Sequence, residues 1–151
     1  MSIEQAYNFI QIDELVSSSG SISEIALIDE GFHLVVNLLP NDNEHARATE
    51  KQEFESLGVD YEYVPVDWNN PQIEAYESFE SILKHYQNKK IHVHCAANFR
   101  ATAFYGVYGY RNLGWSEMQL YDLIASIWNI EEYPLWEKYV SDLITAEYIG
   151  T

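Results

Sequence analysis

The residues best suited to chemistry stand together in one segment, His94-Cys-Ala-Ala-Asn-Phe-Arg100, which holds the single cysteine of the 151-residue chain. A thiolate is a strong nucleophile, and a guanidinium can bind a tetrahedral oxyanion through two parallel hydrogen bonds. If the backbone N–H groups of residues 96–100 point inward, they complete an anion cradle. The spacing therefore predicts Cys95 as a nucleophile and Arg100 as the clamp on an anionic substrate group.

Two other interpretations of this segment stay open on residue types alone. A free cysteine commonly ends a buried strand as a small apolar residue, and Cys95 fits that role as well. His92, His94 and Cys95 also offer the imidazole and thiolate groups that bind zinc, with the two histidines on one face of a strand. No fourth ligand lies nearby at a motif spacing, so we expect neither a metal nor another cofactor. A single cysteine likewise excludes an intramolecular disulfide.

The charge of the chain limits its partners. Acidic residues outnumber basic ones by 24 to 8, which gives a formal net charge of -16. Such a field repels nucleic-acid backbones and anionic bilayers, so we expect neither nucleic acid nor a membrane as a partner. Any phosphate site must create its own positive potential. The chain has no apolar run of about 18 residues and no leader-like start, which favours a cytoplasmic location.

The elements around the segment alternate between short apolar runs and longer amphipathic stretches, the pattern of a parallel sheet with crossover helices. We expect a single α/β domain over residues 1–151, with a mainly parallel sheet of four to five strands and helices on both faces. Strands are predicted over 8–12, 32–39, 61–66 and 91–94, a turn over 17–20, and helices over 21–31, 43–57, 72–86, 101–112, 116–128 and 134–148.

The Cys95 segment then joins a predicted strand to a predicted helix. In an open α/β sheet, ligands bind at the carboxyl ends of the strands, where this turn would lie. The N-terminus of the following helix adds a positive partial charge that attracts anions. A cysteine placed there beside a guanidinium has its thiolate form favoured. The turn thus supplies locally the positive potential that the whole chain lacks.

These residues resemble the His-Cys-loop-Arg signature of protein tyrosine and dual-specificity phosphatases. Along nearly its whole length the chain is similar to a bacterial branch, the dual-specificity-phosphatase-like family formerly called DUF442. Its landmarks occur here in the family's order: Asn8-Phe-Ile-Gln-Ile-Asp13, Ser17-Ser-Ser-Gly20, Val35-Val-Asn-Leu38, Val64-Pro-Val-Asp67 and the loop from Cys95 to Arg100. The resemblance implies the three-layer α/β fold of tyrosine phosphatases.

The resemblance also implies a metal-free, two-step hydrolysis of a phosphate monoester. Cys95 would take the phosphoryl group, and water would then hydrolyse the phosphocysteine. The partner would be a phosphorylated small molecule or a phosphoprotein, with inorganic phosphate or sulfate able to fill the same pocket. The implied phosphate-binding residues are Ala96, Ala97, Asn98, Phe99 and Arg100.

Two further roles are implied by the same resemblance. His94 would order the loop and tune the thiol, and Asp67 would be the general acid that protonates the leaving oxygen. From the residues alone, His94 could also be a packed strand histidine. Asp67 is equally well explained as a turn or helix-capping residue ahead of Asn-Asn-Pro. Trp68 is a candidate for the wall of the pocket mouth, although aromatic residues are frequent throughout this chain.

The loop departs from the common pattern of five residues between Cys and Arg and a hydroxyl directly after Arg. Here the spacer has four residues, Ala101 follows Arg100, and Thr102 comes one step later. Asn98 stands where related loops usually have Gly, a place that Asn tolerates better than most residues. These departures predict slow hydrolysis of the phosphoenzyme and leave open a non-catalytic domain that binds phosphate or a phosphoprotein.

A four-residue spacer is also typical of rhodanese-type sulfurtransferases, whose loop holds a cysteine persulfide. A second enzyme class therefore competes with the phosphatases. His94 before the cysteine, the Asp67 loop and the order of the N-terminal landmarks favour the phosphatase.

Overall fold

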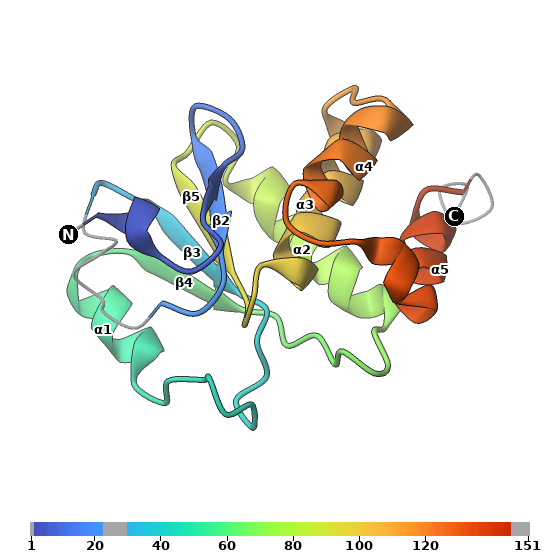
Figure 1. The fold of residues 1–151 in the computed structure, drawn as a ribbon. Helices are drawn as coiled ribbons and strands as arrows, with labels where there is room; N and C mark the ends of the chain where they lie inside the picture. The colour runs from blue at the N-terminus through green and yellow to red at the C-terminus, as the bar shows by residue number, and fades with distance from the viewer. Residues whose placement is uncertain (1, 23–29, 146–151) are drawn as a thin grey trace.

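The computed structural model describes residues 2–22 and 30–145. At its centre is a five-stranded sheet of order β1-β2-β5-β3-β4 (Figure 1). Its strands are β1 (Ile10–Gln11), β2 (Val16–Ser19), β3 (Leu34–Asn37), β4 (Asp60–Tyr63) and β5 (Ile91–His94). Only β1 and β2 pair antiparallel, and the pairs β2–β5, β5–β3 and β3–β4 are parallel. The predicted α/β class with a mainly parallel sheet is confirmed.

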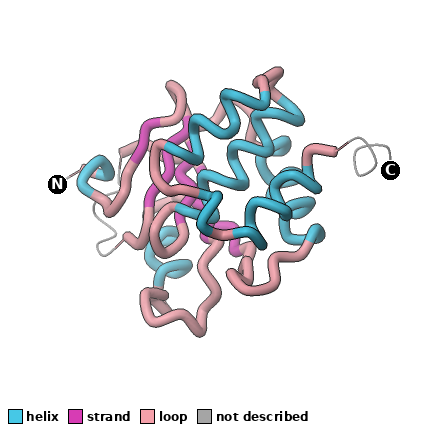
Figure 2. The backbone as a smooth tube through the Cα atoms, turned by 45° about the vertical axis from the view of Figure 1, so that its right-hand side comes forward, coloured by secondary structure: helices cyan, strands magenta, loops and turns pink. Residues whose placement is uncertain are grey.

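Helices cover both faces of this sheet, as predicted. The helices are α1 (Glu50–Ser56), α2 (Ile73–His85), α3 (Phe99–Asn112), α4 (Glu117–Ala125) and α5 (Pro134–Leu143), with 3-10 turns η1 (Ile3–Gln5) and η3 (Ile130–Glu132). Figure 1 places α1 on one side of the strands and α2 through α5 on the other, and Figure 2 shows these latter helices grouped together. No helix within the described residues is long and apolar enough to span a membrane.

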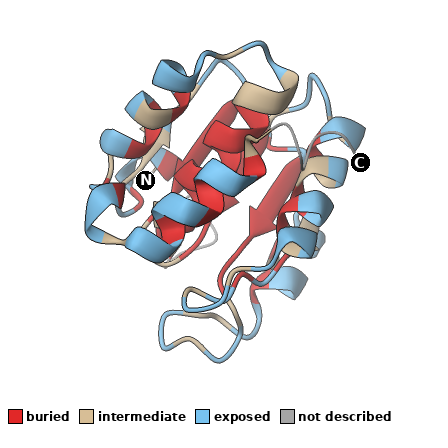
Figure 3. Ribbon diagram, turned by 90° about the vertical axis from the view of Figure 1, so that its right-hand side faces the viewer, coloured by how far each residue is buried: buried red, intermediate tan, exposed pale blue. Residues whose placement is uncertain are grey.

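Two apolar clusters hold the layers together. The smaller joins η1 and α1 to the sheet through Ile3, Val35 and Phe54, and the larger packs α2 to α5 on the opposite face. Figure 3 shows the buried residues gathered on the strands and inner helix faces. Helix α3 is largely enclosed, since every residue from Arg100 to Gly109 is buried. The loop before α3 therefore connects two largely buried elements, β5 and α3.

Several predicted elements occur where local signals placed them. Strand β5 covers the predicted residues, and α2 and α3 begin within two residues of the predicted positions. Ser116 and Gln119 form the expected capping box, with side-chain to backbone distances of 3.1 and 2.8 Å. Pro134 occupies the first turn of α5. The helix predicted over 21–31 falls largely outside the described residues, as does the predicted end of the last helix.

The turn predicted over residues 17–20 was wrong, because Val16–Ser19 is the buried strand β2. Serine favours turns in a sequence because its hydroxyl readily bonds nearby backbone. Here the hydroxyls of Ser17 and Ser19 instead bond the two ring nitrogens of His92, each at 2.8 Å. A partner more than 70 residues away therefore satisfies the hydroxyls of Ser17 and Ser19, whereas the buried hydroxyl of Ser18 has no partner among the described residues.

The helix predicted over 43–57 begins later than expected, at Glu50. The preceding residues form turns, in which the Asn43 side chain accepts a hydrogen bond from the backbone N–H of His45 at 2.8 Å. Asparagine competes with a helix in this way by bonding its own neighbouring backbone. The predicted stop at Gly58 is confirmed, since that residue has a φ of 78°.

Candidate active site

The loop between β5 and α3 brings most of the predicted site residues around one pocket. Asn98 precedes α3 with φ 70° and ψ 9°, the left-handed conformation expected for this position. The pocket has a volume of about 270 Å³. Its lining residues are Trp68, Cys95, Ala96, Ala97, Phe99, Arg100 and Tyr133. The cysteine and the arginine thus share one cavity at the carboxyl end of the sheet.

Contacts from the N-terminal segment hold the loop carbonyls away from this pocket. The carbonyl of Ala96 accepts a hydrogen bond from the Ser21 N–H at 3.0 Å, and that of Ala97 accepts one from Asn8 Nδ2 at 3.0 Å. Asn98 Nδ2 donates in return to the Asn8 carbonyl at 2.8 Å. In a trans peptide the N–H points opposite to the C=O. The N–H group of Ala97 therefore faces away from Ser21, whereas the bridge between Gly20 and Ala97 directs the N–H of Asn98 toward the end of β2.

The guanidinium of Arg100 is buried without a counter-ion. The residue is 8% exposed, and its Cζ lies 5.5 Å from the centroid of the Trp68 ring. In the described part of the chain it forms no ion pair, and its Nε has no hydrogen-bond partner. A buried charge is costly unless it is paired. An anion bound in the pocket would supply the missing partner.

His94 points to the opposite face of the sheet, toward α1. Its Nε2 bonds the carboxylate of Glu50, and its Nδ1 lies 3.4 Å from the carbonyl oxygen of Cys95. Both side chains of the pair are almost fully buried. Sequence reasoning missed Glu50, because it lies in the middle of the helix predicted over 43–57, where a glutamate is ordinarily a solvated residue. Its buried partner lies 44 residues further along the chain.

Asp67, the predicted general acid, does not line the pocket. Its side chain is exposed, and Oδ1 accepts a hydrogen bond from the Asn69 N–H at 2.9 Å, as a turn aspartate does. The next residue, Trp68, does line the pocket. The structure thus places the acid candidate beside the mouth of the cavity and outside its lining.

Three aromatic residues line the pocket, and two more pack against them in one cluster, which we call the aromatic wall: Trp68, Phe99 and Tyr133 at the pocket, with Trp128 and Trp136 behind them. Trp68 stacks on Trp136 with centroids 5.0 Å apart, and Phe99 stacks on Trp128 at 4.7 Å. The indole of Trp136 also donates to the Trp68 carbonyl at 2.8 Å. Sequence analysis proposed only Trp68 for this role, since the other members come from separate elements.

Thr102 does not replace the hydroxyl that is missing directly after Arg100. Its O–H donates to the Asn98 carbonyl at 2.8 Å and its oxygen accepts from the Trp128 indole at 3.0 Å. The Thr102 hydroxyl therefore links the loop to the aromatic wall, and it is used there both as a donor and as an acceptor. A role beside the sulfur would require both bonds to break.

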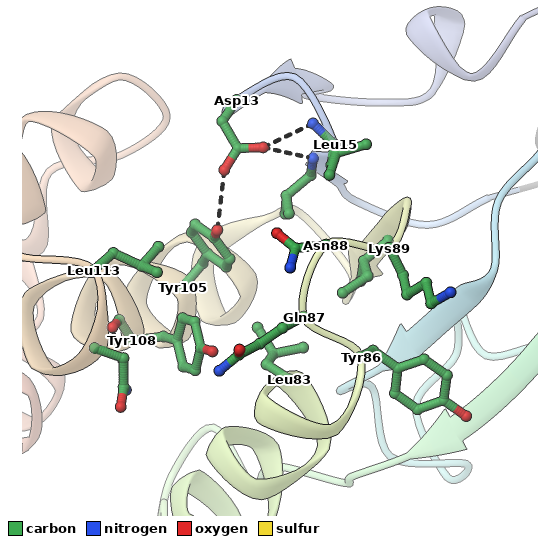
Figure 4. Close-up of a pocket in the computed structure, with 13 residues that line it drawn as sticks. Asp13, Leu15, Leu83, Tyr86, Gln87, Asn88, Lys89, Tyr105, Tyr108 and Leu113 are labelled. Carbon is green, nitrogen blue, oxygen red and sulfur yellow. Dashed lines mark hydrogen bonds between the residues drawn. The ribbon is translucent and has the colours of Figure 1, made fainter.

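A second pocket, of about 300 Å³, lies at the other end of the strands, between the start of β2 and α3 (Figure 4). The Asp13 carboxylate there accepts hydrogen bonds from the backbone of Leu15 and Val16 and from the Tyr105 hydroxyl. Burial, followed by the charge of Asp13, raises the pKa of Tyr105, which keeps the phenol protonated. This pocket therefore offers no activated nucleophile, and the Cys95 pocket is the better candidate despite its slightly smaller volume.

The alternative metal site is not supported by the geometry. Both ring nitrogens of His92 bond serine hydroxyls, and burial, with a smaller contribution from His94, holds the pKa of His92 well below its usual range. No group of three or more His, Cys, Asp or Glu side chains within residues 2–22 and 30–145 is arranged to hold a metal ion.

Replacing Gly20 with alanine should collapse the anion cradle. A Cβ at this position would lie 2.5 Å from the Ala96 carbonyl oxygen and 3.0 Å from the Ala97 Cα, so the loop must move. We expect the free energy of unfolding to fall by about 1–3 kcal/mol. Phosphate binding, measured by isothermal titration calorimetry, should be lost.

Gly109→Ala is the matched control for this prediction. Its Cβ would overlap the Trp115 ring at 2.4–2.8 Å, far from the loop. This variant should be destabilised but should still bind phosphate. Wild-type phosphate affinity in Gly20→Ala would contradict the role given to the loop carbonyls.

Comparison with solved structures identifies the relatives of this fold. Two crystal structures of DUF442 phosphatase-like proteins from Shewanella putrefaciens CN-32 are similar to it. One is 30% identical over 97% of this chain and 96% of the other, with a TM-score of 0.84. The second is 27% identical over 94% and 92%, with a TM-score of 0.85.

A more distant relative shares the fold alone. The core catalytic domain of the PP-IP phosphatase Siw14 from S. cerevisiae, crystallised with citrate, is 16% identical over 90% of this chain and 85% of its own, with a TM-score of 0.70. No family model and no curated protein sequence matches the chain. At 30% identity across nearly the full length of both chains, this chain belongs to the DUF442 family of phosphatase-like proteins.

Proposed function

We propose that this protein is a cysteine-dependent phosphatase that hydrolyses a phosphate monoester through a phosphocysteine on Cys95. The observation that carries the proposal is the arrangement around the sulfur. The carbonyls of Ala96 and Ala97 are bonded outward, and the guanidinium of Arg100 is buried in the same pocket without a counter-ion. Such a cradle suits a tetrahedral dianion, and it concentrates positive potential on a strongly acidic protein.

The reaction has two balanced steps. The Cys95 thiolate attacks phosphorus, an S–P bond forms, the ester P–O bond breaks, and the leaving oxygen takes a proton from an acid. Water then attacks phosphorus, the S–P bond breaks, and inorganic phosphate leaves with the thiolate restored. Arg100 and the loop amides bind the nonbridging oxygens in both steps. Neither step requires a metal.

The lining of the pocket favours a single phosphate on a flat apolar group. Arg100 is the only cationic side chain among the residues that line the cavity in the described part of the chain. A polyphosphorylated ligand would leave its additional charges unpaired in a protein of net charge -16. Trp68, Phe99 and Tyr133 offer ring faces on which a planar leaving group can stack. An aryl phosphate is therefore the preferred substrate class.

The proposal is tested with para-nitrophenyl phosphate and the full chain. We expect release of nitrophenol that vanadate inhibits, with a fast first turnover and a slower steady state, because no hydroxyl follows Arg100 to assist the second step. Acid quenching during the steady state should trap a phosphocysteine. Phosphate binding without release of nitrophenol would instead establish a non-catalytic domain. Sulfur transfer from thiosulfate to cyanide would establish the sulfurtransferase.

Asp67→Asn should slow alkyl phosphates by about 10- to 100-fold but aryl phosphates by less than about threefold. An alkyl phosphate has a poor leaving group that needs a proton, whereas an aryl phosphate has a good leaving group that does not. A loss of rate that is larger for alkyl phosphates therefore reports on the general acid. Asparagine keeps an acceptor for the Asn69 N–H, which preserves the turn. The measurement is kcat/KM for each substrate. Equal losses on both substrates would remove Asp67 from this role.

A further inference from the structure

A series of polar contacts leads across the sheet to the backbone of Cys95. Asn37 Nδ2 on β3 donates to the Tyr61 hydroxyl on β4 at 2.8 Å, and the Glu50 carboxylate lies close enough to that hydroxyl to raise the pKa of Tyr61. Glu50 bonds Nε2 of His94, whose Nδ1 lies 3.4 Å from the Cys95 carbonyl oxygen. Four separate elements, β3, β4, α1 and β5, contribute to this series.

The direction of each bond follows from which groups can donate. The amide of Asn37 donates, so the Tyr61 hydroxyl accepts there and its own proton is available to the nearby Glu50 carboxylate. The carboxylate of Glu50 then has acceptors available for His94. Burial, followed by the charge of Glu50, raises the pKa of Tyr61, which keeps that hydroxyl protonated as a donor.

His94 faces an acceptor at each ring nitrogen. One is the Glu50 carboxylate and the other is the Cys95 carbonyl oxygen, which cannot donate. An ionised carboxylate and a carbonyl oxygen can only accept, so both bonds form together only when each ring nitrogen carries a proton. With both nitrogens protonated, His94 can satisfy both acceptors at once.

We infer that Glu50 is a positioning residue for the thiol: its buried carboxylate holds His94 as an imidazolium, which fixes the Cys95 carbonyl on the α1 face. The role as nucleophile rests on the function proposed above. A carbonyl held on the α1 face cannot turn into the anion cradle and repel the substrate. An imidazolium on the residue next to Cys95 also favours the thiolate.

Few other titratable groups face this pair. His92 on the same strand is neutral because burial lowers its pKa, and Tyr61 faces the pair from β4. On α1, the nearby carboxylate of Glu53 is paired with Arg47. Glu50 is therefore the group whose charge should set the protonation of His94.

The first test uses the unaltered protein. Long-range ¹H–¹⁵N spectra of the imidazole rings report the protonation of each ring nitrogen, and the His94 signals can be assigned by their loss in His94→Asn. We expect both nitrogens of His94 to carry protons at pH 7. One unprotonated ring nitrogen at that pH would overturn the inference.

The second test uses the reaction of iodoacetamide with the thiol, which reports on Cys95 alone because the chain has one cysteine. In Glu50→Gln we expect the rate at pH 7 to fall by about three- to tenfold, the effect of a nearby charge at intermediate dielectric. The rate profile should also move to higher pH. Glu53→Gln, which changes a carboxylate on the same helix, should keep the wild-type profile.

A folded Glu50→Gln protein with an unchanged alkylation profile would also overturn the inference. If that variant does not fold, Tyr61→Phe removes the hydroxyl close to the same carboxylate and should move the profile in the same direction by less. Neither readout requires turnover. Absence of phosphatase activity with a normal His94 response would therefore refute the proposed function alone.

Discussion

Cys95→Ser is expected to lower the turnover of para-nitrophenyl phosphate by about 10⁴-fold or more, the scale on which loss of a nucleophile acts. A serine hydroxyl is almost fully protonated at neutral pH, and the loop offers no base to activate it, since His94 points to the other face of the sheet. The substitution replaces one sulfur by one oxygen in a buried site. The backbone bond from the Cys95 N–H to the Ser19 carbonyl, at 3.3 Å, does not depend on the side chain.

Phosphate binding separates loss of chemistry from loss of structure in this variant. The loop amides and Arg100 are unchanged, so Cys95→Ser should bind inorganic phosphate within about threefold of wild type by calorimetry. Removal of the thiolate also removes a negative charge from beside the anion. Equal turnover by wild type and Cys95→Ser, in matched preparations, would show that the measured activity does not come from this pocket.

Arg100→Lys is expected to weaken phosphate and vanadate binding by about 100-fold and to lower kcat/KM by at least as much. Lysine keeps the positive charge but has no planar fork, so it cannot donate two parallel hydrogen bonds to one phosphate. It also loses the packing of the guanidinium on Trp68. The measurement is the dissociation constant of phosphate, together with the rise in melting temperature that phosphate produces.

Arg111→Lys is the matched control for this variant. Arg111 is similarly enclosed, but its Nε bonds the Glu80 carboxylate at 2.8 Å, far from the loop. We expect this substitution to lower stability while the phosphate affinity stays at the wild-type value. If Arg100→Lys binds phosphate as tightly as wild type, the buried guanidinium is not the anion clamp.

The pocket illustrates how a local arrangement can oppose the field of the whole protein. The chain carries 24 acidic residues, which disfavour the approach of any anion. Under the proposed function, the N-terminus of α3, the loop amides and the enclosed guanidinium of Arg100 would outweigh this field over the few ångströms of the pocket, because burial weakens solvent screening. The same contrast favours a substrate with one phosphate over a more highly charged one.

The sequence by itself determined much of the secondary structure, because the signals that begin and end helices and strands act between residues a few positions apart. The capping box at Ser116 and Gln119, the proline that opens α5 and the strand–loop–helix order around Cys95 all follow from neighbours one turn apart. The spacing of Cys95 and Arg100 also brings them to one pocket, because a tight loop before a helix leaves few other arrangements. Segments dominated by such local preferences are predictable without knowledge of the fold.

Only the tertiary structure decided which way the groups of the site face. The outward carbonyls depend on Asn8 and Ser21, which lie 89 and 75 residues before their partners. The pairing of Glu50 with His94 spans 44 residues, and two of the three serines of β2, Ser17 and Ser19, have their hydroxyls bonded by His92. Propensity favoured a turn at those serines and a solvated role for Glu50. Burial overrode both preferences, because a buried polar group is stable only where a distant partner bonds it.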